Sequence, residues 1–321
     1  MTDPVGAADR LHGTVSTAVD EILAAATAPP GQIFVGWAAA GDAAACPAAY
    51  RAQGEDGWGF PGWSPALAAG AIARAALDLH LDDRRGAADR SPQPLEAVRG
   101  WIRTATSVGA RGVAGWVGDL RADRDTAMLA AAAAAASRWL AGFVRVLGWP
   151  LPPGLVLLNV TRDEGQGTAP RWWPRKGSPV SVGTGADARL GRVRGAGGHT
   201  LVVHRPSAGD DRDLHARATF EAAAGALVHR VPPAAVVVTA GDTGERARVE
   251  VDGAMLAAGG DMIVEVVRQR AVAVDRGHDP ADATPSARCR WCDLLDVCPP
   301  GRDWLTVAGR WRGGLPVVGL G

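Results

Sequence analysis

The sequence of 321 residues is poor in several residue types that often mark a function. Lys176 is the single lysine among 34 basic residues, and Tyr50 is the single tyrosine. Because 34 acidic residues balance the basic ones, overall charge does not drive the protein onto DNA or an anionic membrane. No apolar stretch reaches the roughly 20 residues of a membrane span, and "MTDPVGAADRLHG" lacks the basic and apolar regions of a signal peptide. We therefore expect a cytoplasmic protein with no membrane partner.

Cysteine is also scarce, with four in the chain. Cys289, Cys292 and Cys298 form a C-x2-C-x5-C cluster, whereas Cys46 lies far upstream in "ACPAAYR". In a reducing compartment, thiols at this spacing are more often metal ligands than disulfides. Zinc accepts four thiolates tetrahedrally, and an iron-sulfur cluster accepts four thiolates from distant parts of a chain. The spacing alone leaves three interpretations open: an iron-sulfur cluster, a zinc site, or buried free cysteines.

The pattern of apolar residues changes near residue 150. Apolar positions recur at helical spacing over residues 66–81 and 94–147, and short β-rich runs follow at 155–160, 199–205 and 234–240. Helical patterns return at 213–230 and 252–274. We predict an N-terminal segment (1–45), a helical subdomain with the first cysteine (46–150), an α/β core (151–275), and a linker with the cysteine cluster (276–321).

Two segments, "ACPAAYR" and "CRWCDLLDVCPPGRDW", with an α/β core between them, resemble the iron-sulfur branch of the RecB-family PD-(D/E)XK nucleases. That branch includes CRISPR-associated RecB-like nucleases and the nuclease domains of bacterial helicase-nuclease complexes. The match covers roughly residues 33–305. It implies a restriction-endonuclease-like core, in which helices flank a mixed central sheet, and a helical subdomain inserted after the first motif. It also implies that a [4Fe-4S] cluster joins the two ends of the domain, held by Cys46, Cys289, Cys292 and Cys298.

The catalytic motifs of this family are mostly replaced in the chain. The family uses carboxylates that hold Mg²⁺ or Mn²⁺ and a lysine beside the attacking water. "GAIAR" resembles the Gly-x-x-x-His motif with Arg74 in place of the histidine, and Asp187 in "GTGADARLG" keeps the Gly-x-x-Asp motif. His204 falls where the second carboxylate belongs, and Pro206 falls where the lysine belongs. Since the single lysine lies upstream, no small shift of the alignment restores the catalytic one.

Asp187 and His204 therefore have two interpretations. As remnants of a catalytic site, a carboxylate and an imidazole suit a transition metal but make a poor magnesium site. As structural residues, Asp187 caps a turn and His204 packs at the end of an apolar strand, and we favour this role. A third possibility is an active nuclease whose missing carboxylates come from Glu221 or Asp210.

The segment "VSVGTGADA" also has the G-x-G-x-x-A spacing of a dinucleotide-binding loop. Such a loop opens a helix that places the pyrophosphate at its amino terminus. The residues that follow, "RLGRVRGAGGHTLVV", instead predict a turn and another strand. We therefore disfavour a dinucleotide site.

A basic and aromatic window predicts a nucleic-acid surface. Positive charge beside aromatic faces follows a phosphate backbone and stacks on exposed bases, although the same residues also suit solvated arginines and a buried indole. Together with Arg74, the candidates are Arg171, Trp172, Arg175, Lys176, Arg192 and Arg194.

These observations predict a nuclease-like protein with a [4Fe-4S] cluster, a degenerate active site, and an accessory role in DNA repair or processing. The expected partners are single-stranded DNA and a helicase or repair complex. Two alternatives remain: an active metal-dependent DNA exonuclease with shifted catalytic residues, which would need Mg²⁺ or Mn²⁺, and a structural module with a four-cysteine zinc site.

Overall fold

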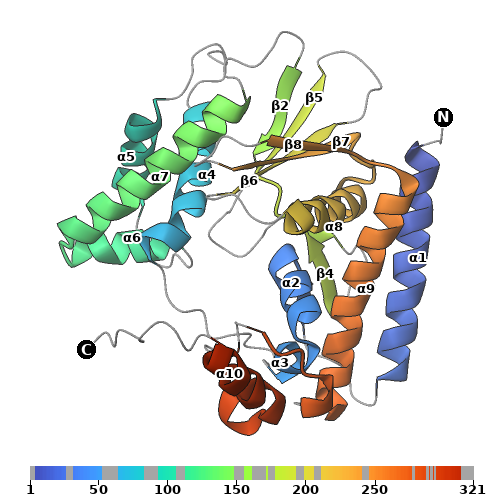
Figure 1. Ribbon diagram of the computed structural model, residues 1–321. Coiled ribbons are helices and arrows are strands. Elements are labelled where there is room, and N and C mark those ends of the chain that lie inside the picture. Colours follow the sequence, from blue (N-terminus) through green and yellow to red (C-terminus); the bar gives the residue numbers. More distant parts are fainter. Residues whose placement is uncertain are drawn as a thin grey trace.

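The computed structural model describes most of the chain. The described ranges are 4–26, 32–52, 64–82, 93–105, 113–147, 155–160, 171–172, 178–192, 199–205, 211–240, 246–276, 279–286, 289, 292 and 294–311. Helices and strands are mixed, as the sequence predicts, and they form two hydrophobic cores. Figure 1 shows the arrangement of these elements.

A five-stranded mixed sheet forms the centre of the α/β part. Its strands are β2 (Leu155–Val160), β5 (Ala188–Arg192), β6 (Thr200–Arg205), β7 (Ala235–Ala240) and β8 (Arg246–Glu250), in that order across the sheet. Neighbouring strands are antiparallel except for β6 and β7, which are parallel. Parallel strands need a crossover connection, and the helix α8 (Asp211–His229) provides it.

A second, smaller sheet joins the beginning of the chain to the region before Asp187. Its order is β1-β4-β3, with β1 (Ile33–Val35) parallel to β4 (Val180–Gly183) and β3 (Arg171–Trp172) antiparallel to β4. The register pairs Ile33 with Val180 and Val35 with Val182. Since Val35 and Val182 are fully buried, this pairing closes one end of the first core.

The helices α1 (Pro4–Ala25) and α9 (Gly253–Arg276) lie side by side (Figure 1), and α9 also contacts α8. Leu11, Val15 and Val19 of α1 belong to the same buried core as the strands and α8. The described parts of the first 45 residues, α1, β1 and α2 (Trp37–Ala45), thus contribute buried side chains to the same core as α8 and α9.

Four helices form the second core on the other face of β6. They are α4 (Pro65–Asp82), α5 (Pro94–Thr104), α6 (Val113–Ala122) and α7 (Thr126–Leu147), and Figure 1 shows them grouped at one side of the molecule. Within the described part of the chain, α7 alone is long and apolar enough to span a membrane by composition. Its Ala132, Ala136, Leu140 and Phe143 are fully buried against this core, which is typical of the core helix of a globular protein.

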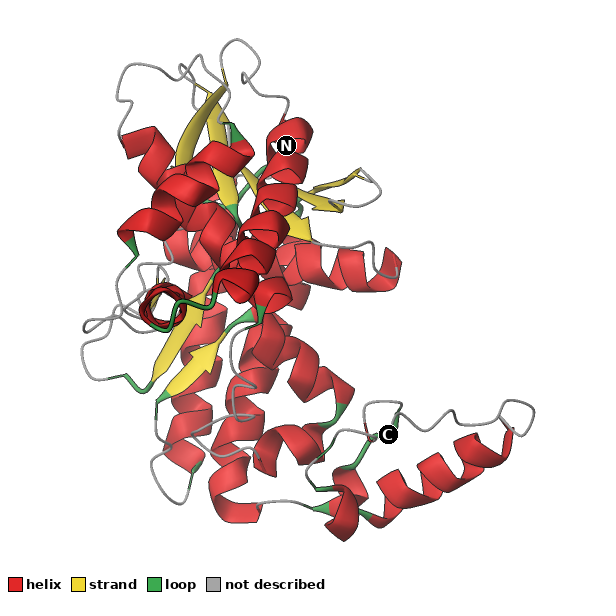
Figure 2. Ribbon diagram, turned by 90° about the vertical axis from the view of Figure 1, so that its left-hand side faces the viewer, coloured by secondary structure: helices red, strands yellow, loops and turns green. Residues whose placement is uncertain are grey.

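Short helices near Cys46 and the cysteine cluster complete the fold. They are α2 (Trp37–Ala45), α3 (Pro47–Ala52), the 3-10 turns η1 (Pro280–Asp282) and η3 (Leu295–Val297), and α10 (Pro299–Trp311). The α3 helix contacts η1, so the beginning and the end of the chain meet here. Figure 2 shows α10 projecting from this end of the molecule.

Candidate functional site

The four cysteines converge from the two ends of the chain. Cys46 follows the last residue of α2, and Cys298 immediately precedes α10. A Cβ atom added at Gly301 would lie 3.4 Å from Cys298 Sγ and 3.5 Å from Cys289 Sγ, so both thiols face this glycine. Burial is the main cause that raises the pKa of the Cys292 thiol, and the charges of Cys289, Cys46 and Cys298 raise it further. All four thiols are therefore within electrostatic range of one another.

Side chains next to Cys46 hold the two chain ends together. Arg51 is only 5% exposed; its Nη1 donates to Gln269 Oε1 of α9 at 2.8 Å, and its Nη2 pairs with Asp282 of η1. The guanidinium of Arg270 lies over the Tyr50 ring, 4.1 Å from its centroid. These contacts fix α3 against the segment that leads into the cysteine cluster.

The four thiols gather without forming a ligand set for a single ion. All four are free cysteines, so no disulfide joins them. Among the residues that the structure describes, no group of three or more His, Cys, Asp or Glu side chains is arranged to hold one metal ion.

A second polar centre lies where α4, the β4–β5 connection and β6 meet. The two carboxylate oxygens of Asp187 are both engaged: Oδ1 lies 2.6 Å from Arg74 Nη1, and Oδ2 accepts the backbone N–H of His204 at 2.5 Å. Asp187 also donates its own backbone N–H to the carbonyl of Val202. The side chain of Asp187 is only 3% exposed, so Arg74 neutralises a buried charge.

The backbone of His204 contacts this carboxylate, but its imidazole ring contacts Thr239 and Trp139. Its Nδ1 lies 2.7 Å from Thr239 Oγ1, and its ring meets Trp139 edge to face with 4.6 Å between centroids. Burial lowers the pKa of His204, and the charge of Asp187 opposes this effect. Asp187 thus binds the backbone of His204 and not its imidazole, which fits the structural interpretation better than a metal-binding pair.

Glu221 on α8 forms a second neutralised carboxylate near Asp187. Its Oε2 accepts Thr184 Oγ1 and the backbone N–H of Gly185, each at 2.8 Å, and its Oε1 lies 2.9 Å from Arg217 Nε. Burial raises the pKa of Glu221, whereas the charge of Arg217 lowers it. A Cβ atom at Gly185 would lie 2.7 Å from Arg217 Nη2 and 2.9 Å from Glu221 Oε1, so Gly185 packs directly against this ion pair. Arg217 lies four residues before Glu221 on a helix, a spacing that favours an ion pair but belongs to no functional motif.

Several predicted residues fall outside the described part of the chain. Pro206 and Asp210 lie in the segment 206–210, which is outside the described residues. The basic candidates Arg175 and Lys176 lie in 173–177, and Arg194 lies in 193–198, both also outside them. For Arg171, Trp172 and Arg192 only the backbone in β3 and β5 is described. Because Arg171 pairs with Gly183, the start of the basic window lies beside the connection that carries Asp187.

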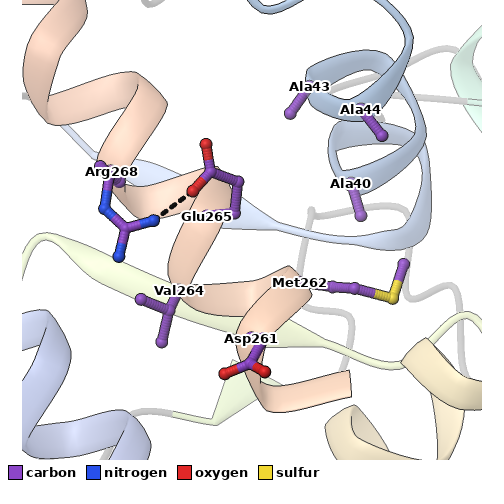
Figure 3. Close-up of a pocket in the computed structure, with 8 residues that line it drawn as sticks. All are labelled: Ala40, Ala43, Ala44, Asp261, Met262, Val264, Glu265 and Arg268. Carbon is purple, nitrogen blue, oxygen red and sulfur yellow. Dashed lines mark hydrogen bonds and ion pairs between the residues drawn. The ribbon is translucent and has the colours of Figure 1, made fainter. Parts of the chain in front are cut away.

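A cavity of about 400 Å³ lies between α2 and α9 (Figure 3). Ala40, Ala43 and Ala44 form one wall, and the other comes from α9. Glu265 there already pairs with Arg268 and accepts Gln269 Nε2 at 2.5 Å. One wall of the cavity is therefore apolar, the α9 wall mixes Met262 and Val264 with charged side chains, and Asp187 is not among the lining residues.

The dinucleotide interpretation of "VSVGTGADA" is excluded by the local structure. Residues 188–192 form β5, antiparallel to β6, where a dinucleotide loop would open a helix.

No model of a known protein family matches the chain, and no protein of curated function matches it at a significant level.

Proposed function

We propose that this protein is related to the RecB-like nucleases, binds a [4Fe-4S] cluster that joins the two ends of the chain, and has lost the hydrolytic centre. We further propose that it binds single-stranded nucleic acid and has an accessory role in DNA repair or processing. The observation that carries the proposal is the Arg74–Asp187 ion pair, at the two positions where the family's first two motifs resemble this chain. An arginine there gives the carboxylate a permanent positive partner, so Asp187 needs no metal to balance its charge.

Catalysis by a PD-(D/E)XK site requires carboxylate oxygens that are free to bind a divalent cation. Both oxygens of Asp187 already have close partners, Arg74 and the backbone of His204. A metal ion would have to displace a charged hydrogen bond, which is among the stronger kinds in proteins. This arrangement favours a protein without hydrolytic activity over an active nuclease with shifted catalytic residues.

The order of elements supports the restriction-endonuclease-like core. Two antiparallel strands, β5 and β6, follow Asp187 and carry His204, and α8 then leads to the parallel strand β7. The family's motifs come in the same order, from a strand through a tight turn to a second strand and then a helix. Along the chain, the helices α5 to α7 follow α4 and precede the strands of this core. The inserted helical subdomain is expected at this place in the sequence.

The proposal of a cluster in preference to zinc rests on the resemblance of the two cysteine segments to the iron-sulfur branch of the family. Both a cluster and a zinc ion accept four thiolates. The thiols of Cys289 and Cys298 both face Gly301, and the charges of Cys46, Cys289 and Cys298 act on Cys292. Cys46, Cys289, Cys292 and Cys298 would then hold a cluster that joins the ends of the chain.

The test begins with anaerobic purification, metal analysis and visible absorption. We expect a brown protein with about four iron atoms per chain, whereas a colourless protein with one zinc would support the structural-module alternative. The loaded protein is then incubated with single-stranded DNA and Mg²⁺ or Mn²⁺, and binding is measured at several salt concentrations. We expect binding that weakens as salt rises, without degradation of the DNA.

Two variants make this result decisive. DNA degradation that disappears in Asp187→Ala would show an active site and defeat the proposal. Degradation that disappears in Glu221→Gln would support the exonuclease with shifted residues. Absence of DNA binding by the iron-loaded protein would remove the nucleic-acid function but leave the cluster assignment standing.

A further inference from the structure

A cluster of basic side chains lies at the opposite end of β6 from His204, and the proposed function does not use it. The cluster consists of Arg189 on β5, His199 immediately before β6, and His229 at the last position of α8. The rings of His199 and His229 lie edge to face, with 5.5 Å between their centroids and 89° between their planes. Arg189 pairs with Leu201 on β6, and since side chains alternate along a strand, Arg189 shares a face with His199.

Contacts of the backbone bring His199 and the end of α8 to the same part of the sheet. The carbonyl of His199 accepts the backbone N–H of Ala234 at 2.8 Å, which ties the start of β6 to the segment that leads into β7. The helix α8 packs very closely on β6, because a Cβ atom at Gly225 would lie 2.6 Å from Leu201 Cδ1. His229 at the end of α8 is therefore held over the same face of the sheet.

Arg189 gives the cluster its positive charge at neutral pH, and among the described residues no acid is an electrostatic neighbour of either histidine. The electrostatic neighbours that lower the pKa of His199 are His229 and Arg189, and Arg189 also lowers the pKa of His229. Burial, followed by these neighbours, lowers the pKa of each histidine to about 4. The segment from 193 to 198 that joins β5 to β6, "VRGAGG", contains no acid either.

Two nitrogens of the cluster leave their hydrogen-bonding capacity unused. His199 is only 6% exposed, and within the described part of the chain its Nε2 and Arg189 Nε have no hydrogen-bond partner. A buried polar atom without a partner destabilises the folded state, so such atoms usually meet a ligand, water or another side chain. An anion with several acceptor oxygens would satisfy both nitrogens and balance the charge of Arg189.

We propose that Arg189, His199 and His229 form a binding site for a phosphate group. Phosphate suits the cluster because arginine and histidine donate to oxygens, and because a compact anion can contact donors from β5, β6 and α8 together. The site extends the proposed function without depending on it, since inorganic phosphate alone is a sufficient probe.

Proton uptake accompanies this binding. A bound phosphate favours the charged form of each imidazole and raises its pKa from about 4 toward its ordinary value. Without an anion, the unfolded chain binds more protons than the folded protein between about pH 6.5 and 4, so stability falls as pH decreases through that window. Phosphate opposes this fall, and its stabilising effect grows as pH decreases from 8 toward 5.5.

The experiment compares melting temperatures of the full chain in phosphate and in chloride of equal ionic strength, at pH 8 and pH 6. For phosphate at ten times its Kd we expect a rise of about 2 °C, larger at pH 6. Sulfate serves as a second probe because its charge is constant over this range. Arg189→Gln and His199→Gln should abolish the rise, whereas Arg103→Gln on α5 and His215→Gln on α8, both at exposed positions, should keep it.

A measurement on the unaltered protein covers the case in which these variants do not fold. Proton NMR follows the seven histidines through a pH titration, and phosphate should raise the pKa of two of them. The proposal is overturned if no histidine responds, if phosphate acts no more strongly than chloride, or if the folded variants keep the full temperature rise.

A single-stranded oligonucleotide identifies the source of the phosphate. If Arg189→Gln weakens oligonucleotide binding as well as the effect of inorganic phosphate, the site contacts a nucleic-acid backbone. If the variant loses only the effect of inorganic phosphate, the site takes a free phosphate ion. Both outcomes support the site, and they separate it from the DNA binding of the proposed function.

Discussion

At the scale of the residue, Arg74 determines the character of the site around Asp187. The guanidinium combines an ion pair to Asp187 with a position over the Trp139 ring, 5.8 Å from its centroid. Arginine remains charged at all relevant pH values and is held here by a buried acceptor and an aromatic face. Arg74 therefore stabilises the fold by neutralising the buried carboxylate of Asp187.

Removing Arg74 tests this role. Arg74→Ala leaves the Asp187 carboxylate, which is only 3% exposed, without a charged partner, and we expect a loss of about 3 kcal/mol in the free energy of unfolding. Denaturant titration measures this loss. Arg103→Ala, at an exposed position on α5, should change stability by no more than about 0.5 kcal/mol.

A double variant separates charge from packing. Asp187→Asn added to Arg74→Ala removes the uncompensated charge, so it should recover part of the lost stability. A loss below about 1 kcal/mol in Arg74→Ala, or no recovery in the double variant, would contradict a structural ion pair.

At the scale of the element, the contact between α8 and α9 depends on small residues. A Cβ atom at Gly259 of α9 would lie 2.5 Å from the backbone oxygen of Thr219 and 2.6 Å from Ala223 Cβ, both on α8. A backbone atom in the middle of a helix cannot move aside as a flexible side chain can. The two helices therefore approach each other at a distance that only glycine permits.

Two glycine-to-alanine substitutions in helices should have opposite effects. Gly259→Ala should destabilise the protein by about 1 to 3 kcal/mol through overpacking, although alanine favours helix. Gly13→Ala on α1 meets no atom within 4 Å and should stabilise by about 0.5 to 1 kcal/mol, the difference in helix propensity. Thermal and denaturant unfolding measure both changes, and stabilisation by Gly259→Ala would show that α8 and α9 are farther apart than described.

Sequence patterns predicted the helices and strands well where the pattern was strong. The runs at 199–205 and 234–240 contain β6 and β7, and the helical pattern at 213–230 covers most of α8. The short strand β1 and its pairing with β4 were not predicted, because three apolar residues, Ile33 to Val35, have no periodicity to read. The packing of α1 on α9 was also missed, since helix partners depend on surface shape and not on local sequence.

At the scale of the whole molecule, the two ends of the chain meet around the cysteines. Arg51 connects α3 to Gln269 and Asp282, and Arg270 covers the Tyr50 ring. These contacts involve residues that closely follow Cys46 in the chain, and Gly301 of α10 faces the thiols of Cys289 and Cys298. A cofactor bound there would cross-link the beginning and the end of the fold.

This arrangement predicts that Cys46 is as important as the clustered cysteines. Cys46→Ser should lower the iron content and the melting temperature about as much as Cys292→Ser, because a site with three ligands holds its cofactor poorly and metal binding contributes directly to folding. Ala44→Ser, two residues earlier at an exposed position, is the matched control and should resemble the unaltered protein. A Cys46 variant with full iron content and stability would defeat the proposal of four ligands.

The sequence by itself determined which residue types are available: four thiols, a single lysine, a single tyrosine, and equal numbers of acidic and basic residues. Only the tertiary structure decided how they combine. It paired Arg74 with Asp187, turned the ring of His204 toward Thr239, and joined Arg189 with two histidines that no motif connects. The physical reason is that ion pairs and ligand sets depend on distances in space, and these distances are set by packing between elements that lie far apart in the chain.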